Sequence, residues 1–160
     1  MPTPTYDLIA SNVLSSSASS VTFSSLNTIA ATYRDLVIVA EGAAGSSTST
    51  VFGYLNSDTN SNYNWVRMQG DGSSAVTSAS SATNQPWIFN WGQSLMIVQY
   101  FDFAQTDKHK NWIARGNAAN ARVSAIAGRW ANTNAVTSIT LQLQTGTFAA
   151  GSTFYLYGIA

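Results

Sequence analysis

The sequence contains no cysteine and very little charge. Without thiols the chain forms no disulfide and offers no thiolate ligand to a metal. Charged residues make up 9% of the 160 residues, whereas a typical domain has about 25%. Seven basic and seven acidic residues cancel to a net charge of +0, so no basic stripe is available for phosphates. We therefore expect neither nucleic acid nor a membrane as a partner.

Long apolar runs and helical periodicity are scarce as well. The strongly apolar stretches, such as Leu95–Val98, are far too short to cross a bilayer. The first residues lack the basic and apolar regions of a secretory signal. Two of the three prolines fall within residues 1–5, which we expect to form an extended N-terminal arm. Pro2, Pro4 and Tyr6 are the candidates for docking this arm on a neighbouring protein.

Period-two alternation of apolar and polar residues dominates the rest of the chain. In Val136–Gln144, for example, Ile139, Leu141 and Leu143 share one face, whereas Asp35–Ala40 is apolar on both faces and reads as a central strand. The sequence predicts an all-β fold: one antiparallel, jelly-roll-like β-sandwich over residues 6–160. The other expected strands are Tyr6–Ala10, Ser20–Ser24, Thr50–Asn56, Tyr63–Gln69, Gln85–Trp91, Ser94–Phe103, Lys110–Arg115, Arg122–Trp130 and Ser152–Ile159.

Turn signals separate these strands. Clusters of Gly, Asn, Asp and Ser predict turns at residues 41–45, 56–60, 70–72, 116–117 and 146–151. Residues 73–84 consist almost entirely of Ser, Ala and Thr, and this composition predicts a low-complexity polar loop.

Reactive groups that would support catalysis are few. His109 is the single histidine, in a polar segment next to Asp107, and we interpret it as a surface or turn residue. No Gly-x-Ser-x-Gly motif is present. The carboxylates read as strand-end and turn residues, except Asp102, which we expect to be buried and paired, with an arginine as the candidate partner. We therefore expect no enzymatic activity, no catalytic residues and no cofactor.

One segment resembles the first part of a calcium loop. Asp58, Asn60 and Asn62 place oxygen atoms at alternate positions, but the later glycine and the closing glutamate are missing. Asp and Asn are also ordinary turn formers. The plain turn is the favoured interpretation, and the three residues are weak candidates for a metal site.

The aromatic residues are the most distinctive group, with five Trp, seven Tyr and seven Phe. Tyr63, Trp65, Trp87 and Trp91 lie in two short segments that mix aromatic and amide side chains, as a face that stacks on sugar rings would. The alternative is that they fill the core or a subunit interface, where large aromatic side chains contribute most. We favour a core or interface role over a glycan site.

Several short segments are distributed along nearly the whole chain: Tyr6–Ala10, Val21–Phe23, Tyr33–Val39, Asn56–Asp58, Ser61–Tyr63, Thr106–Lys110, Val136–Leu141 and Gly151–Ile159. Together they resemble a family of small virion proteins from phages of cyanobacteria and marine bacteria, and the resemblance is weakest over residues 73–93. It implies a β-sandwich with a structural role in the virion and no enzymatic activity, and it brings no functional residues with it.

Three functions follow as expectations. The first is a capsid decoration (cement) protein that folds in the host cytoplasm, binds the outside of the shell as a trimer and contacts the major capsid protein and itself. The second is a tail-associated or receptor-binding module for host glycans, and the third is a carbohydrate-active enzyme. A fibre needs a shaft of repeats or heptads, which the sequence lacks, and weak contacts repeated by symmetry add up on a shell. The first expectation is therefore favoured.

Overall fold

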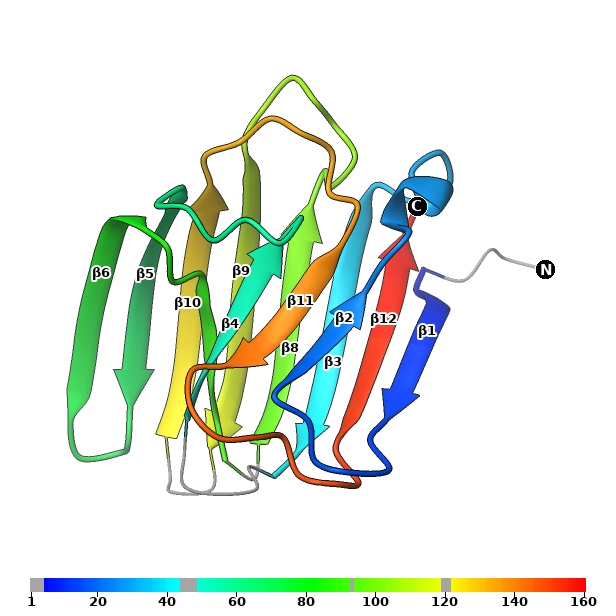
Figure 1. Ribbon diagram of the computed structural model, residues 1–160. Coiled ribbons are helices and arrows are strands. Elements are labelled where there is room, and N and C mark those ends of the chain that lie inside the picture. Colours follow the sequence, from blue (N-terminus) through cyan, green and yellow to red (C-terminus); the bar gives the residue numbers. More distant parts are fainter. Residues whose placement is uncertain (1–4, 44–48, 93, 119–121) are drawn as a thin grey trace.

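The protein folds into two antiparallel β-sheets that pack as a sandwich (Figure 1). The computed structural model describes residues 5–43, 49–92, 94–118 and 122–160. The large sheet contains, in spatial order, β1 (Asp7–Val13), β12 (Thr153–Ile159), β3 (Asp35–Gly42), β8 (Ser94–Phe101), β9 (Lys110–Ala118), β10 (Arg122–Trp130), β5 (Tyr63–Gly70) and β6 (Ala75–Thr83). The small sheet contains β2 (Ser20–Phe23), β11 (Ile139–Leu143), β4 (Ser49–Leu55) and β7 (Trp87–Trp91). The predicted antiparallel β-sandwich is confirmed.

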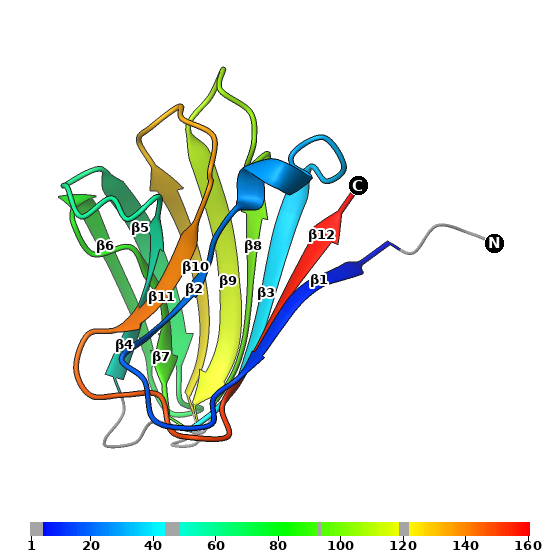
Figure 2. The ribbon, with the colours of Figure 1, turned by 45° about the vertical axis from the view of Figure 1, so that its right-hand side comes forward.

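The order of the strands brings the first and the last strand together. β1 and β12 are neighbours at one edge of the large sheet, and the chain crosses between the two layers as it proceeds (Figure 2). Eight strands form the runs β1-β12-β3-β8 and β2-β11-β4-β7, an interleaving that favours the predicted jelly-roll form. The other four strands are the hairpins β5–β6 and β9–β10. With β5 and β6, the large sheet extends past the small one (Figure 1).

Alternation decides which side chains enter the core. In β12, Phe154 and Leu156 are buried between the sheets, while Tyr155 and Tyr157 point to the opposite side. The predicted inward set of β11 is buried as well. Most of the largest buried side chains in this core are aromatic. Burial of these rings, and not the few charged residues, determines which side of each strand faces the core. The largest fully buried side chains include Trp91, Trp112, Trp130, Tyr63, Tyr100, Phe89, Phe103, Phe148 and Phe154.

Two predicted loops are strands in the structure. Residues 75–83 form β6, because the backbone of this polar segment pairs with β5 from Gly70↔Ala75 to Tyr63↔Thr83. The turn before β6 is closed by Asp71, whose Oδ1 accepts hydrogen bonds from the N–H groups of Ser73 (3.0 Å) and Ser74 (2.7 Å). The turn predicted at Gly116–Asn117 lies inside β9, where a side chain at position 116 would overlap the ring of Phe89.

Candidate functional site

Three of the four aromatic residues proposed for an interface or a glycan site belong to the core. Tyr63 and Trp91 are 0% exposed and Trp65 is 9% exposed. Trp65 packs edge-on against Trp87, with ring centroids 5.0 Å apart, and its indole N–H donates to the carbonyl of Gln85 (3.0 Å). Of the core and interface roles favoured from the sequence, Tyr63, Trp65 and Trp91 have the core role. Their interface and glycan-stacking roles are corrected, because side chains enclosed by their own chain stack on no ligand and contact no partner.

Trp87 differs because it is only partly buried. The guanidinium Cζ of Arg67 lies 4.2 Å from the centre of the Trp87 ring, a cation–π contact. Burial lowers the pKa of Arg67, and the nearby Arg122 lowers it further. Asn90 donates its amide hydrogen to Gln69 Oε1 beside this pair (3.2 Å). Arg67 therefore already covers a face of Trp87, within a small cluster of amide and guanidinium groups.

Asp58 is the centre of a hydrogen-bonded turn. Its Oδ1 accepts from the backbone N–H and the side-chain amide of Asn60 (both 2.9 Å), and its Oδ2 accepts from Asn62 Nδ2 (2.7 Å) and Trp130 Nε1 (2.6 Å). Burial by itself raises the pKa of Asp58, but these hydrogen bonds outweigh it and leave the pKa lowered. Because four N–H groups already occupy the carboxylate, the geometry favours the plain turn over a calcium loop.

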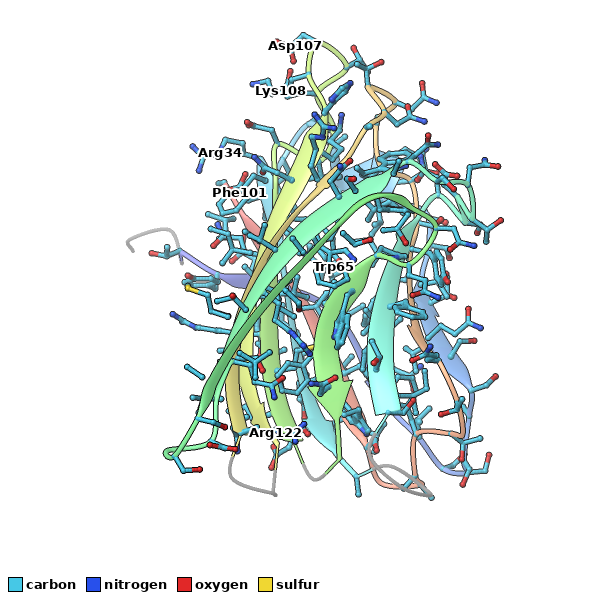
Figure 3. All side chains as sticks on the ribbon, turned by 90° about the vertical axis from the view of Figure 1, so that its left-hand side faces the viewer. Arg34, Trp65, Phe101, Asp107, Lys108 and Arg122 are labelled. Atoms are coloured by element: carbon cyan, nitrogen blue, oxygen red, sulfur yellow. The ribbon has the colours of Figure 1, made fainter. Side chains whose placement is uncertain are left out.

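The segment that contains His109 projects from one end of the sandwich. Asp107 and Lys108 mark the tip of this β8–β9 connection, at the opposite end of the molecule from Arg122 (Figure 3). His109 is exposed. Asp102, predicted to be buried and paired with an arginine, is 33% exposed and pairs with Lys108 Nζ at 3.3 Å. The prediction for Asp102 is therefore wrong in both burial and partner.

Lys110 is a buried cation that sequence reasoning missed. Its side chain is 1% exposed, and its Nζ donates to the carbonyl oxygens of Lys108 and Thr133, both at 3.1 Å. Burial lowers the pKa of Lys110, and the negative charges of Asp107 and Asp102 partly offset this effect. Since both partners are backbone carbonyls of neighbouring loops, Lys110 ties these loops together.

The N-terminal arm lies largely outside the described residues. Pro2 and Pro4 belong to residues 1–4, so their docking role stays a prediction. Tyr6, the third candidate, is 55% exposed. It lines a shallow hollow on the large sheet together with Val37, Ile97, Arg115 and Tyr157.

The most unusual surface of the described molecule is the side of the large sheet that faces away from the small sheet, here called the outer face. A solvated sheet face normally carries polar residues. Nine large apolar side chains are exposed in the described part of the chain, and all but Val76 lie on the outer face. The eight are Tyr6, Leu8, Val13, Val66, Met68, Leu95, Ile113 and Val123.

Sequence reasoning did not identify the outer face as a surface. The signal was present in strands that are apolar on both sides, such as Asp35–Ala40, where Leu36 and Ile38 point inward and Val37 and Val39 point outward. A strand buried on both faces is the ordinary explanation of that pattern. In this chain the small sheet covers only one of the two faces.

Comparisons with known proteins add no relative. No protein-family model matches the sequence, and no curated protein is significantly similar to it. The resemblance to phage virion proteins therefore stays a prediction. Among the described residues, no group of three or more His, Asp or Glu side chains is arranged to hold a metal ion. The same part of the chain contains no helix of the length and apolar character that crossing a membrane requires.

Proposed function

We propose that the protein is a non-enzymatic structural protein of a phage virion, which decorates the outside of the capsid as an oligomer and contacts the major capsid protein. The observation that carries the proposal is the apolar outer face. The largest apolar patch on a typical monomer covers about 300–600 Å². On this face, exposed apolar residues extend across the large sheet from β1 at one edge to β5 near the other. A protein with such a surface is suited to a permanent place in an assembly.

The distribution of polar groups supports a role without catalysis. His109 is exposed on a loop, and Asp58 is already occupied by four hydrogen bonds. Lys110, the buried cation, is bound to two carbonyl oxygens. Each of these groups has a structural explanation in its own turn or loop.

Virions that lack the protein test the proposal. Packaged DNA presses on the shell, and a decoration protein adds many small contacts that resist this pressure. We expect such virions to lose infectivity on heating or osmotic shock while they adsorb to hosts at the normal rate. Normal resistance combined with lost adsorption would overturn the proposal, and imaging of intact particles would locate the protein on the shell or on the tail.

The glycan-binding alternative rests on Trp87, the one candidate aromatic that keeps an accessible part beside Asn90 and Arg67. A purified protein applied to a glycan array tests it. Specific binding that Trp87→Ala abolishes, while Trp65→Phe retains it, would favour the alternative. Binding that is absent or unchanged by Trp87→Ala would count against it.

A further inference from the structure

The register of the large sheet aligns the outward side chains in rows that cross all eight strands. Directly paired residues of an antiparallel sheet share a face, so the rows follow from the pairing. The two central rows contain apolar or small side chains apart from a few polar ones. The first consists of Leu8, Tyr157, Val37, Gln99, Ile113, Ala127, Val66 and Ala79, and the second of Ser11, Tyr155, Val39, Ile97, Arg115, Ala125, Met68 and Thr77.

Polar and charged side chains occur at both ends of the outer face, together with apolar ones. The row at one end contains Glu41 and Asn117 beside the exposed Val13, Leu95 and Val123, and the row at the other end contains Asn111, Arg129 and Asn64 beside Phe101. Arg129 donates a hydrogen bond to Asn64 Oδ1 at 3.1 Å. A largely apolar surface that also carries a few amide and charged groups has the composition of a protein–protein interface.

The area of the outer face matches what a stable pair requires. Eight strands at a spacing of about 4.8 Å, with about seven residues each at about 3.3 Å per residue, cover roughly 900 Å². A stable interface buries about 800 Å² on each partner. One contact across the whole face is therefore sufficient for a specific complex.

Glu41, Arg115 and Arg129 are the charged side chains exposed on the described outer face, and two of them, Glu41 and Arg129, can pair with a copy of the same chain. Glu41 of β3 and Arg129 of β10 are exposed at opposite ends of the face, with β8 and β9 between their strands. Among the described residues, neither side chain forms an ion pair within the chain. We consider a twofold axis that lies in the plane of the interface and crosses the line from Glu41 to Arg129 at its midpoint, at a right angle. This axis places Glu41 of each copy opposite Arg129 of the other. The same axis passes through the middle of the sheet, brings the apolar rows of the two copies together and places Arg115 of each copy near Arg115 of the other.

We infer that a second copy of this chain covers the outer face, in a twofold pair held by the apolar rows and by two reciprocal Glu41–Arg129 contacts. A twofold interface is self-complementary, so one patch serves both partners. This arrangement replaces the trimer expected from the sequence as the basic unit. The inference does not depend on the virion role, because it concerns the protein alone in solution.

The mass of the purified protein in solution tests the pair. Analytical ultracentrifugation of the full chain at micromolar concentration is expected to give twice the 17.0 kDa of one chain. Ile113→Lys and the milder Met68→Gln change exposed side chains of the outer face, and both are expected to give single chains with an unchanged circular dichroism spectrum. Val76→Lys is the matched control, because Val76 is 46% exposed on the other side of the sheet, and this variant is expected to remain paired.

Three outcomes would overturn the inference. They are a wild-type mass of one chain, a pair that survives both Ile113→Lys and Met68→Gln, and a trimer that these variants dissociate. If a lysine at 113 prevents folding, Met68→Gln decides alone.

Charge reversal tests the twofold arrangement itself. Glu41→Lys places like charges at two sites across the axis and is expected to weaken pairing by about tenfold. The double variant Glu41→Lys with Arg129→Glu restores opposite charges and is expected to recover wild-type affinity. A double variant weaker than Glu41→Lys alone would overturn the arrangement. Loss of shell binding by a protein that still pairs in solution would instead overturn only the proposed function.

Discussion

The indole ring of Trp112 in β9 packs directly against the backbone of its cross-strand partner Gly128 in β10. A Cβ atom at position 128 would overlap the ring atoms Cζ2 and Cε2. Trp112 is 1% exposed and also contacts Tyr63 and Tyr100, so the ring has no free space into which it can move. The missing side chain of Gly128 is therefore part of the core packing.

The first prediction concerns this contact. Gly128→Ala is expected to lower the free energy of unfolding by about 1–3 kcal/mol, because overpacking forces the ring or the strand to shift. Gly70→Ala is the matched control in the neighbouring strand β5, since its Cβ would meet only Ser74 O, at 3.6 Å. Urea unfolding followed by tryptophan fluorescence measures both variants. Equal stabilities would contradict the described contact.

The second prediction compares two buried tyrosines. Tyr63 donates its hydroxyl to Asp58 O (2.9 Å) and accepts from the N–H of Leu55 (3.2 Å), whereas the hydroxyl of Tyr100 has no partner among the described residues. Tyr63→Phe is expected to cost about 1–3 kcal/mol of stability, because it leaves a buried N–H unpaired. Tyr100→Phe is expected to be neutral or stabilising. Thermal unfolding of the two variants measures the difference, and the reverse order would contradict the hydrogen bonds.

The third prediction is a loss of stability in acid. Burial raises the pKa of Asp35, but hydrogen bonds from Arg34, the Asp102 N–H and Gln99 outweigh burial, and the pKa is lowered. The pKa of Asp58 is lowered in the same way by its own hydrogen bonds. A carboxylate with a lowered folded-state pKa contributes its stability above its unfolded-state pKa of about 4, and this stability is lost as the pH falls toward the folded-state pKa. Asp58→Asn is expected to reduce the stability at pH 7 and to flatten its decline below about pH 4, measured as the urea midpoint against pH. An unaltered decline in Asp58→Asn would count against this role.

The fourth prediction concerns Asn56, which has a left-handed backbone (φ 52°). Its Oδ1 accepts from the N–H groups of Thr137 (2.7 Å) and Ser138 (3.2 Å), and its amide donates to Ala135 O (2.8 Å). Asn56→Gly keeps the backbone geometry but removes these bonds, so we expect a loss of about 1–3 kcal/mol in urea unfolding. Ser57→Gly at the next position (φ 56°) is the control and is expected to be neutral or stabilising.

Sequence predicted most strands because the information for them is local. Ile139, Leu141 and Leu143 alternate with polar residues, and that period alone identifies a strand and its buried side. β6 lacks the signal, since its Ser, Ala and Thr side chains are mostly exposed, and its structure comes from backbone pairing with β5. Composition separates apolar from polar segments, but it says little about a polar edge strand.

The candidate surface was harder to predict, for a different physical reason. Val66 and Trp65 are adjacent apolar residues, yet the first is 57% exposed and the second is 9% exposed. Their burial depends on whether another layer covers each side of β5, and that layer comes from a segment distant in sequence. Sequence identifies both residues as apolar, while only the arrangement of the layers shows which one is left for a partner.

The outer face also determines what a pair would present to its surroundings. Joining two large sheets leaves both small sheets on the outside, facing in opposite directions. Their outward residues include Thr22 and Thr140, whose hydroxyl groups lie 2.9 Å apart, and the exposed Gln142. A protomer with one apolar face would thus become a dimer that exposes the same uncharged, hydroxyl-rich surface on two opposite sides. Any third molecule would bind to that surface or to the edges of the sheets.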